Sequence, residues 1–219
     1  MACFITFEGI EGCGKTTQLG LLARNLAGRG HDVVVTREPG GCPIADQVRE
    51  ILLDAGNRAM APLTELLLYA AARSQHVAEI VAPSLALGHI VLCDRFTDAT
   101  LAYQGFGRGL DQGVIGDLNR LATGSICPDL TVLVDCPVEV GLRRAMDRIN
   151  NSAGVREERF ELESLQFHRK VREGYLKLAQ MEPERFIVIN GAESIKETEA
   201  AIAAAVLSWL SERERNALR

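Results

Sequence analysis

The chain has 219 residues, of which 47% are hydrophobic and 24% charged, and its formal net charge is −5. This composition excludes a disordered or collagen-like chain and favours one globular domain spanning residues 1–219. The negative charge argues against a general nucleic-acid binder and a membrane-surface protein. Arginine outnumbers lysine by 20 to 4. Because arginine binds phosphate through a bidentate fork, either a site for several phosphates or biased codon usage would explain the excess.

The sequence carries no signal for secretion or for a membrane span. The first residues lack a basic leader, and the apolar runs are shorter than the roughly 18 residues of a membrane helix. The six cysteines form no C-x-x-C pair and no zinc-type spacing. We therefore expect reduced thiols in a cytoplasmic protein, with Cys13 in an exposed loop that oxidants can reach.

Five short runs rich in Val, Ile, Leu and Phe are nearly continuous rather than alternating. That pattern is typical of parallel strands covered on both faces. Helical patterns lie between the runs, which predicts an α/β fold: a three-layer, doubly wound, five-stranded parallel sheet. In chain order we expect strand 3–7, helix 15–29, strand 32–36, helix 44–53, helix 64–87 with a capping box at its start, strand 90–93, helix 113–121, strand 130–134, helix 138–148, helix 157–180, strand 186–189 and helix 194–213.

One polar segment, residues 150–154, interrupts the charged helical pattern and is flanked by arginines on both sides. A solvated loop between two surface helices would have this composition. A small lid segment, about 144–160, that closes over a phosphate-bearing substrate would have it too.

Residues 9–16, Gly-Ile-Glu-Gly-Cys-Gly-Lys-Thr, match the phosphate-loop pattern G-x-x-x-x-G-K-[ST] in full. The motif follows the first predicted strand and opens the first predicted helix. In this arrangement backbone N–H groups surround phosphates, Lys15 reaches the β- and γ-phosphates, and Thr16 can hold Mg²⁺. The predicted nucleotide-binding residues here are Gly9, Ile10, Glu11, Gly12, Cys13, Gly14, Lys15, Thr16 and Thr17.

Other sequence features restrict the class of phosphate-loop protein. The sequence contains no N-K-x-D and no D-x-x-G motif, which excludes a regulatory GTPase. The chain is barely longer than its expected core, which argues against a motor or transport ATPase. A small kinase remains, and a nucleotide-binding module that drives a partner's conformational change is the alternative.

Asp94 and Arg95 end the third predicted strand. The carboxyl ends of strands in an open α/β sheet are where ligands bind. We expect Asp94 to hold Mg²⁺ together with Thr16, and Arg95 to bind phosphate groups. Asp135, at the end of the fourth predicted strand, is the second candidate for the metal.

Tyr69 and Arg73 are four residues apart on a predicted helix and therefore share one face. An aromatic ring beside a guanidinium would suit a nucleobase. A tyrosine on a leucine-rich helix is also typical of a core position.

Together these residues resemble the bacterial thymidylate (dTMP) kinase family. The matching motifs are Phe7-Glu-Gly-Ile-Glu-Gly-Cys-Gly-Lys-Thr-Thr, Thr36-Arg-Glu-Pro-Gly-Gly, Tyr69-Ala-Ala-Ala-Arg73, Cys93-Asp-Arg, Ala102-Tyr-Gln-Gly and Pro128-Asp-Leu-Thr. The resemblance covers nearly the whole chain in the family's order. It implies a P-loop nucleoside-monophosphate-kinase fold, transfer of the γ-phosphoryl group of ATP to dTMP to give dTDP, Mg²⁺ as cofactor, and a homodimer. A kinase for dUMP or CMP is the nearest alternative.

The resemblance also implies roles for individual residues. Glu11 would face the 3′-hydroxyl of dTMP, Tyr69 would stack on thymine, and Arg73 would hydrogen-bond the thymine edge. The same resemblance assigns Glu38, Arg49, Arg95, Thr100, Tyr103 and Gln104 to the dTMP pocket, with Tyr103 crowding the 2′ position.

The phosphate loop has Gly12 and Cys13 where some family members carry an arginine. In members without that arginine, the lid supplies it. Positive charge on the transferring group assists phosphoryl transfer, so an equivalent arginine is required. The candidates are Arg148, then Arg159 and Arg144, while Arg143 or Arg144 would lie against adenine.

Overall fold

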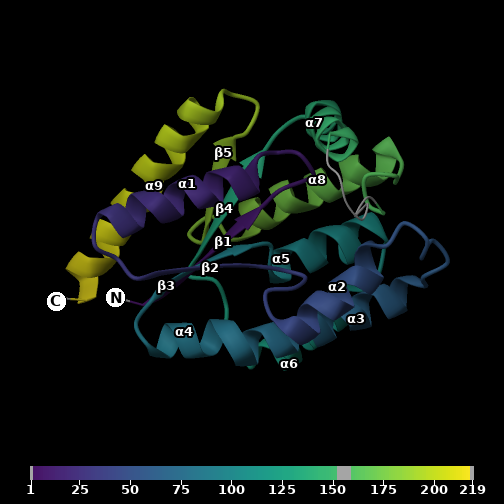
Figure 1. Cartoon of the computed structure of the whole chain (residues 1–219), viewed down its shortest axis with the longest axis horizontal. Coiled ribbons are helices and arrows are strands. Elements are labelled where there is room, and N and C mark those ends of the chain that lie inside the picture. Colours follow the sequence, from purple (N-terminus) through teal and green to yellow (C-terminus); the bar gives the residue numbers. More distant parts are fainter. Residues whose placement is uncertain (1, 152–158, 218–219) are drawn as a thin grey trace.

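The computed structural model of the chain describes residues 2–151 and 159–217 (Figure 1). Within these residues, five strands form one parallel sheet in the order β2-β3-β1-β4-β5, which confirms the predicted fold class. Each predicted strand is present, and no bound differs by more than one residue. The strands are β1 (Cys3–Glu8), β2 (Val33–Arg37), β3 (Ile90–Asp94), β4 (Leu130–Asp135) and β5 (Phe186–Asn190).

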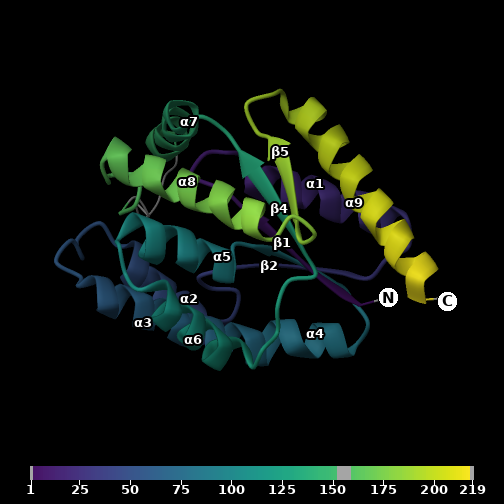
Figure 2. The same ribbon diagram turned by 180° about the vertical axis from the view of Figure 1, so that it is seen from behind.

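Helices cover both faces of the sheet. In Figure 1, α1 lies in front of the strands, and in Figure 2, from behind, α8 does. Helix α9 packs beside α1, and α4 and α8 contact the strands from the other face. The helical elements are α1 (Lys15–Gly28), α2 (Pro43–Leu53), α3 (Pro62–His76), η1 (Val77–Val81), α4 (Ala82–Ala86), α5 (Thr97–Thr100), η2 (Leu101–Gly107), α6 (Gln112–Thr123), α7 (Val138–Asn150), α8 (Leu165–Met181) and α9 (Ile195–Ala217), where η marks a π-helical segment.

The predicted helix 157–180 is wrong over residues 159–164, while residues 157 and 158 lie outside the described residues. Helix α8 begins at Leu165, after Ser164, whose hydroxyl accepts a hydrogen bond of 3.2 Å from the Phe167 N–H. The residues just before it, 159–164, form turns, and Phe160 is buried there against other aromatic rings. Burial of that ring against a distant element ends the local helical pattern.

Two further elements differ from the prediction. Helix α3 begins at Pro62, and its N-cap residue, Ala61, offers no side-chain bond, so the predicted capping box at Thr64 is wrong. The helical stretch 97–107 was not predicted, because glycines such as Gly105 and Gly107 are typical of loops.

The interior of the sheet is mainly apolar, although Thr6, Glu8 and Thr131 are buried there as well. Phe4, Ile5 and Phe7 of β1 and Leu92 of β3 have no measurable exposure. Strands β2 and β5 are partly exposed, because each lies at an edge of the sheet and has a neighbouring strand on one side only. No helix in the described ranges 2–151 and 159–217 is long and apolar enough to cross a membrane.

We expect Leu92→Ala to lower the free energy of unfolding by about 2–5 kcal/mol, because a buried side chain is replaced by a cavity. Leu87→Ala removes the same atoms from a side chain that is 73% exposed and should change stability by less than about 0.5 kcal/mol. Urea denaturation of both variants measures the difference. Equal losses would contradict the assignment of Leu92 to the core.

Candidate active site

A cavity of about 590 Å³ opens at the carboxyl edge of the sheet, beside the ends of β1 and β3. Ligands of open α/β sheets bind at this edge. Its walls come from the phosphate loop, the ends of β2 and β3, helix α3, η2 and the end of α7. The predicted site residues that line it are Glu11, Gly12, Lys15, Thr16, Thr17, Glu38, Arg49, Tyr69, Arg73, Asp94, Arg95, Thr100, Tyr103, Gln104 and Arg148.

Seven predicted site residues are described by the structure but do not line this cavity. Four belong to the phosphate loop, where backbone groups rather than side chains face phosphate. The others are arginines of α7 and of the turn before α8. The seven are Gly9, Ile10, Cys13, Gly14, Arg143, Arg144 and Arg159.

The phosphate loop packs closely on the first turns of α7. A Cβ atom on Gly12, whose φ is +66°, would overlap the carbonyl oxygen of Gly141. A Cβ on Gly141 would in turn overlap the carbonyl oxygen of Glu11. Two backbones therefore meet without side chains between them, and no arginine can occupy position 12. Lys15, which opens α1, donates from Nζ to the Ile10 carbonyl at 3.2 Å, so its ammonium is held across the loop.

The side chains of Thr16 and Asp94 meet at the cavity. The Thr16 hydroxyl donates a hydrogen bond to the Asp94 carboxylate. The competing candidate, Asp135, uses both of its oxygens on Arg172, each at 2.7 Å. Hydroxyl and carboxylate oxygens are the ligands that Mg²⁺ prefers, usually one or two from protein with the rest from water and phosphate. The Thr16–Asp94 pair therefore fits this ion, and no group of three or more ligating side chains occurs among the described residues.

Glu11 lies under the cavity within a shell of hydrogen-bond donors. Its carboxylate accepts from the Tyr103 hydroxyl and from Nη2 of Arg95 at 3.1 Å. Nδ1 of His168 lies 3.3 Å from its other oxygen. Burial by itself would raise the pKa of Glu11. His168 and the charges of Arg95 and Lys15 hold the pKa of this carboxyl well below its usual range. Glu11 is thus an anion at neutral pH despite its burial.

Arg95 is held in an uncommon conformation. Its φ is +70°, in the left-handed region that non-glycine residues rarely adopt. Its guanidinium lies 4.8 Å from the ring centroid of Tyr103, and Nη1 donates to the Tyr175 hydroxyl at 3.1 Å. The side chain is 17% exposed, at the cavity wall. The guanidinium is therefore anchored on its inner side and open toward the cavity.

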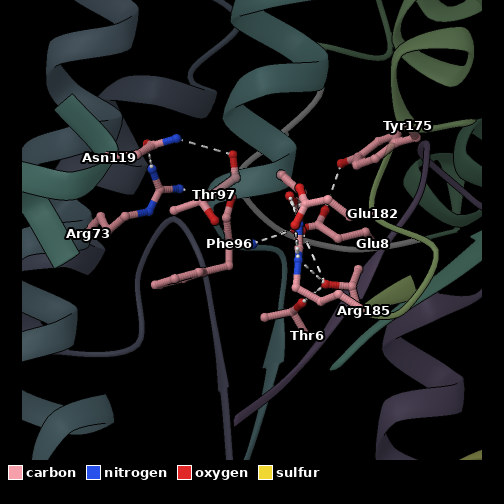
Figure 3. A network of polar contacts seen from close by, with 11 residues as sticks. Thr6, Glu8, Arg73, Phe96, Thr97, Asn119, Tyr175, Glu182 and Arg185 are labelled. Atoms are coloured by element: carbon pink, nitrogen blue, oxygen red, sulfur yellow. Dashed lines mark hydrogen bonds and ion pairs between the residues drawn. The ribbon is translucent and has the colours of Figure 1, made fainter. Parts of the chain in front are cut away.

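Arg73 is 2% exposed and is bonded mainly to the protein. Its Nε donates to Glu38 at 2.8 Å, and its Nη2 donates to the Phe96 carbonyl at 3.0 Å. Nη1 donates to Thr100 at 3.0 Å and to Asn119 at 2.8 Å. Figure 3 shows Arg73 beside Asn119 and Phe96. At most one of its five N–H groups remains for a ligand, so Arg73 also holds the wall together.

Arg159 is directed away from the main cavity. Its Nη1 pairs with Glu65 at 2.6 Å, and its Nε donates to the Leu52 carbonyl. Gln104 donates to the same Glu65 carboxylate at 2.8 Å. Arg159 lines a second, smaller cavity of about 360 Å³, next to Arg108.

The predicted lid segment, about 144–160, is described only at its two ends, because residues 152–158 lie outside the described residues. Arg148 and Ile149 on one side and Phe160 and Glu161 on the other line the cavity. Nη2 of Arg148 lies 3.5 Å from Oε1 of Glu161, and the Arg148 side chain is 63% exposed.

Arg144 lies elsewhere on α7. It donates to the Gly191 carbonyl at 2.8 Å, and Gly191 lies beside the backbone of Cys13. Through Gly191, Arg144 therefore lies next to the backbone of the phosphate loop.

The expectation of an exposed Cys13 is wrong. Its side chain is 1% exposed, and burial raises the pKa of its thiol. The thiolate is the reactive form of cysteine, so this position is protected from oxidants. All six cysteines are described as free thiols, and Cys127 is the exposed one.

Sequence reasoning missed several residues of the site. Asn119 holds Arg73, Tyr175 holds Arg95, and Phe160 covers Tyr69 and Tyr103. Glu8 was missed as well, although the sequence carried a signal for it. A charged residue at the end of a buried apolar strand requires a polar partner. The others lie on helices and turns far away in sequence, where no local pattern marks them.

A phosphate loop that shares one cavity with several arginines, at the edge of a five-stranded parallel sheet, is typical of a P-loop nucleoside monophosphate kinase. The family model described as thymidylate kinase matches residues 7–202. The chain therefore belongs to the thymidylate kinase family, and it is an ATP:dTMP phosphotransferase that converts dTMP to dTDP.

Its relatives cover the chain almost completely. A thymidylate kinase of Geotalea uraniireducens is 72% identical over 97% of this chain and 100% of the relative. One of Geobacter sulfurreducens is 64% identical over 97% of this chain and 100% of the relative. The crystal structure of thymidylate kinase from Ehrlichia chaffeensis superposes with a TM-score of 0.75 at 35% identity, covering 94% of this chain and 98% of that one.

We expect Gly12→Ala to lower kcat/KM for ATP by about 100-fold, because the added carbon displaces the phosphate loop from Gly141. Gly20→Ala is the matched control, since Gly20 lies in α1 with no atom within 4 Å of an added Cβ. The control should keep full activity and gain about 0.5–1 kcal/mol of stability. Steady-state kinetics and thermal melts of both variants test this. Normal kinetics for Gly12→Ala would contradict the close contact.

Proposed function

We propose that the main cavity holds ATP and dTMP with their reacting phosphates between Lys15 and Arg95. The observation that carries this proposal is the convergence of the phosphate loop, the Thr16–Asp94 pair and the Arg95 guanidinium on one wall. Phosphoryl transfer needs positioning and positive charge more than covalent chemistry. The cavity lining has six basic side chains against four acidic ones, which favours several phosphate groups.

On the ATP side, backbone N–H groups of residues 9–17 surround the phosphates, and Lys15 moves from the Ile10 carbonyl to the β- and γ-phosphate oxygens. The adenine lies toward α7, against Arg143 or Arg144. The position of Arg144 beside the backbone of Cys13 and Gly191 supports this placement.

On the dTMP side, thymine stacks on Tyr69 and bonds to the remaining N–H of Arg73. Glu11 and Tyr103 face the sugar, with Glu11 accepting from the 3′-hydroxyl and Tyr103 excluding a 2′-hydroxyl. Glu38, Arg49, Thr100 and Gln104 complete the pocket, and Arg95 binds the acceptor phosphate. All of these residues line the cavity.

Thr16 and Asp94 would hold Mg²⁺. When bound, this ion neutralises negative charge on the nucleotide phosphates. The Thr16 hydroxyl and the Asp94 carboxylate lie next to each other and offer oxygen ligands suited to a small, hard cation.

Arg148 is the proposed catalytic arginine of the lid segment, ahead of Arg159 and Arg144. Its side chain is largely exposed at the cavity, and its ion pair with Glu161 is long enough to exchange for a phosphate. Arg159 is bound instead to Glu65 and to the Leu52 carbonyl. Arg144 is bound to the 191–192 backbone.

We further propose a cytoplasmic homodimer of one-domain chains, residues 1–219. Helices α3 and α6 pack side by side (Figure 2), and both carry exposed apolar side chains. Those most exposed are Leu63, Leu67, Val114 and Leu121. Burial of such a face against a second copy would remove it from water.

Coupled measurement of ADP release tests the reaction. With dTMP as acceptor, release should exceed that with dUMP or CMP, because Tyr69 and Arg73 face the base. Release without any acceptor should be negligible. Equal release with no acceptor would instead favour a nucleotide-driven conformational switch, and faster turnover of dUMP or CMP would reassign the acceptor.

Arg148→Ala should lower kcat by about 1,000-fold, the effect expected for a charge that stabilises the transferring phosphoryl group. Arg143→Ala, a neighbour on the same helix, serves as a comparison and should act mainly on KM for ATP. Single-turnover kinetics separate the two effects. An unchanged kcat for Arg148→Ala would move the catalytic role to Arg159 or Arg144.

A further inference from the structure

Glu8, the last residue of β1, is fully buried next to the cavity wall and has no place in the roles described above. One carboxyl oxygen accepts the Phe96 N–H at 2.7 Å. The other accepts the Tyr175 hydroxyl at 2.8 Å. Figure 3 shows Glu8 between these two partners, which come from the loop after β3 and from α8. A single carboxyl group thus joins three segments that are distant in sequence.

Tyr175 continues this chain of contacts to the guanidinium of Arg95. Its hydroxyl donates to Glu8 and accepts from Nη1 of Arg95 at 3.1 Å. The Tyr175 side chain is 1% exposed, so the hydroxyl cannot exchange its partners for water. The inner side of the Arg95 guanidinium therefore has a fixed neighbour.

The backbone around Arg95 is held by the same network. The Arg95 N–H donates to the Phe7 carbonyl at 2.9 Å. The peptide groups on both sides of Phe96 are also bonded, since the Phe96 N–H donates to Glu8 and the Phe96 carbonyl accepts from Arg73. A non-glycine residue at φ +70° persists only where surrounding contacts hold it there. These contacts supply that support.

The charges that surround Glu8 are consistent with a role in orienting Arg95. Burial, followed by the nearby charge of Asp98, raises the pKa of Glu8 to about 8, while the charge of Arg95 and the bond from Tyr175 oppose that rise. Asp98 itself is paired with Arg185 at 2.7 Å. Arg95, by contrast, donates to the Tyr175 hydroxyl, which in turn donates to Glu8. The Arg95 side chain also lines the cavity.

We propose that Glu8 and Tyr175 are positioning residues that orient the Arg95 guanidinium toward the phosphate of the acceptor nucleotide. Neither touches the nucleotide. Tyr175 fixes the orientation of the guanidinium. Glu8 fixes the orientation of the Tyr175 hydroxyl and the position of the peptide group that follows Arg95. The inference rests on the proposed binding of the acceptor phosphate by Arg95.

The test compares dTMP with thymidine, which has the same base and sugar but no phosphate. Tyr175→Phe removes only the hydroxyl, and we expect it to weaken dTMP binding by about tenfold, as for loss of a hydrogen bond to a charged group. Its affinity for thymidine should stay within about twofold. Isothermal titration calorimetry with each ligand measures both. General damage to the pocket would weaken both ligands equally and would overturn the proposal.

Thr131→Val is the matched control. It removes a buried hydroxyl on β4 that bonds Thr6, Asp98 and Arg185 but not Arg95. We expect unchanged affinity for dTMP and thymidine. If Thr131→Val weakened dTMP binding as much as Tyr175→Phe, the effect would come from the core in general and the proposal would fail.

A double variant separates this inference from the proposed function. In an Arg95→Ala background, Tyr175→Phe should cause no further loss of dTMP affinity, because it acts through Arg95. If Arg95→Ala alone left dTMP binding intact, the proposed phosphate role of Arg95 would be wrong. If Arg95→Ala weakened binding strongly while Tyr175→Phe did not, only the positioning role would be wrong.

Discussion

The site depends on the pairing of β1 with β3. Their register places Phe7 opposite Asp94, so that the two strands end side by side at one edge of the sheet. The chain leaving β1 becomes the phosphate loop, and the chain leaving β3 begins with Arg95, whose N–H donates back to the Phe7 carbonyl. Because parallel neighbours end at the same edge, one register of hydrogen bonds brings the phosphate loop, Arg95 and the Asp94 carboxylate to one cavity.

The charges of the site also form its framework. Buried arginines are costly unless each has partners, and here the partners are carboxylates that line the same cavity. Glu11 pairs with Arg95, and Glu38 pairs with Arg73. Each pair leaves part of a guanidinium facing the cavity while its inner N–H groups are bonded. An overall acidic chain can therefore present a basic pocket, with the arginines held in place before any ligand arrives.

Much of the fold and part of the site could be predicted from local patterns. The five buried strands and the phosphate loop are contiguous in sequence, and their residue types determine backbone shape directly. The turn before α8 could not be predicted, because its form depends on the burial of Phe160 against Tyr103 and Phe167. The burial of Cys13 was also missed, since its side chain belongs to a core cluster with residues more than 100 positions away, such as Val134 and Cys136.

The sequence by itself determined the class of fold, the phosphate loop and the presence of Asp94 and Arg95 at a strand end. The tertiary structure decided which arginines face the cavity. An arginine side chain is long and flexible, so its position in the sequence leaves several partners within reach. Packing selects among them: Arg159 is directed to Glu65, Arg144 to the carbonyl of Gly191, and Arg148 to the cavity. The hydrogen-bond acceptors that determine the direction of each arginine come together only in the folded chain.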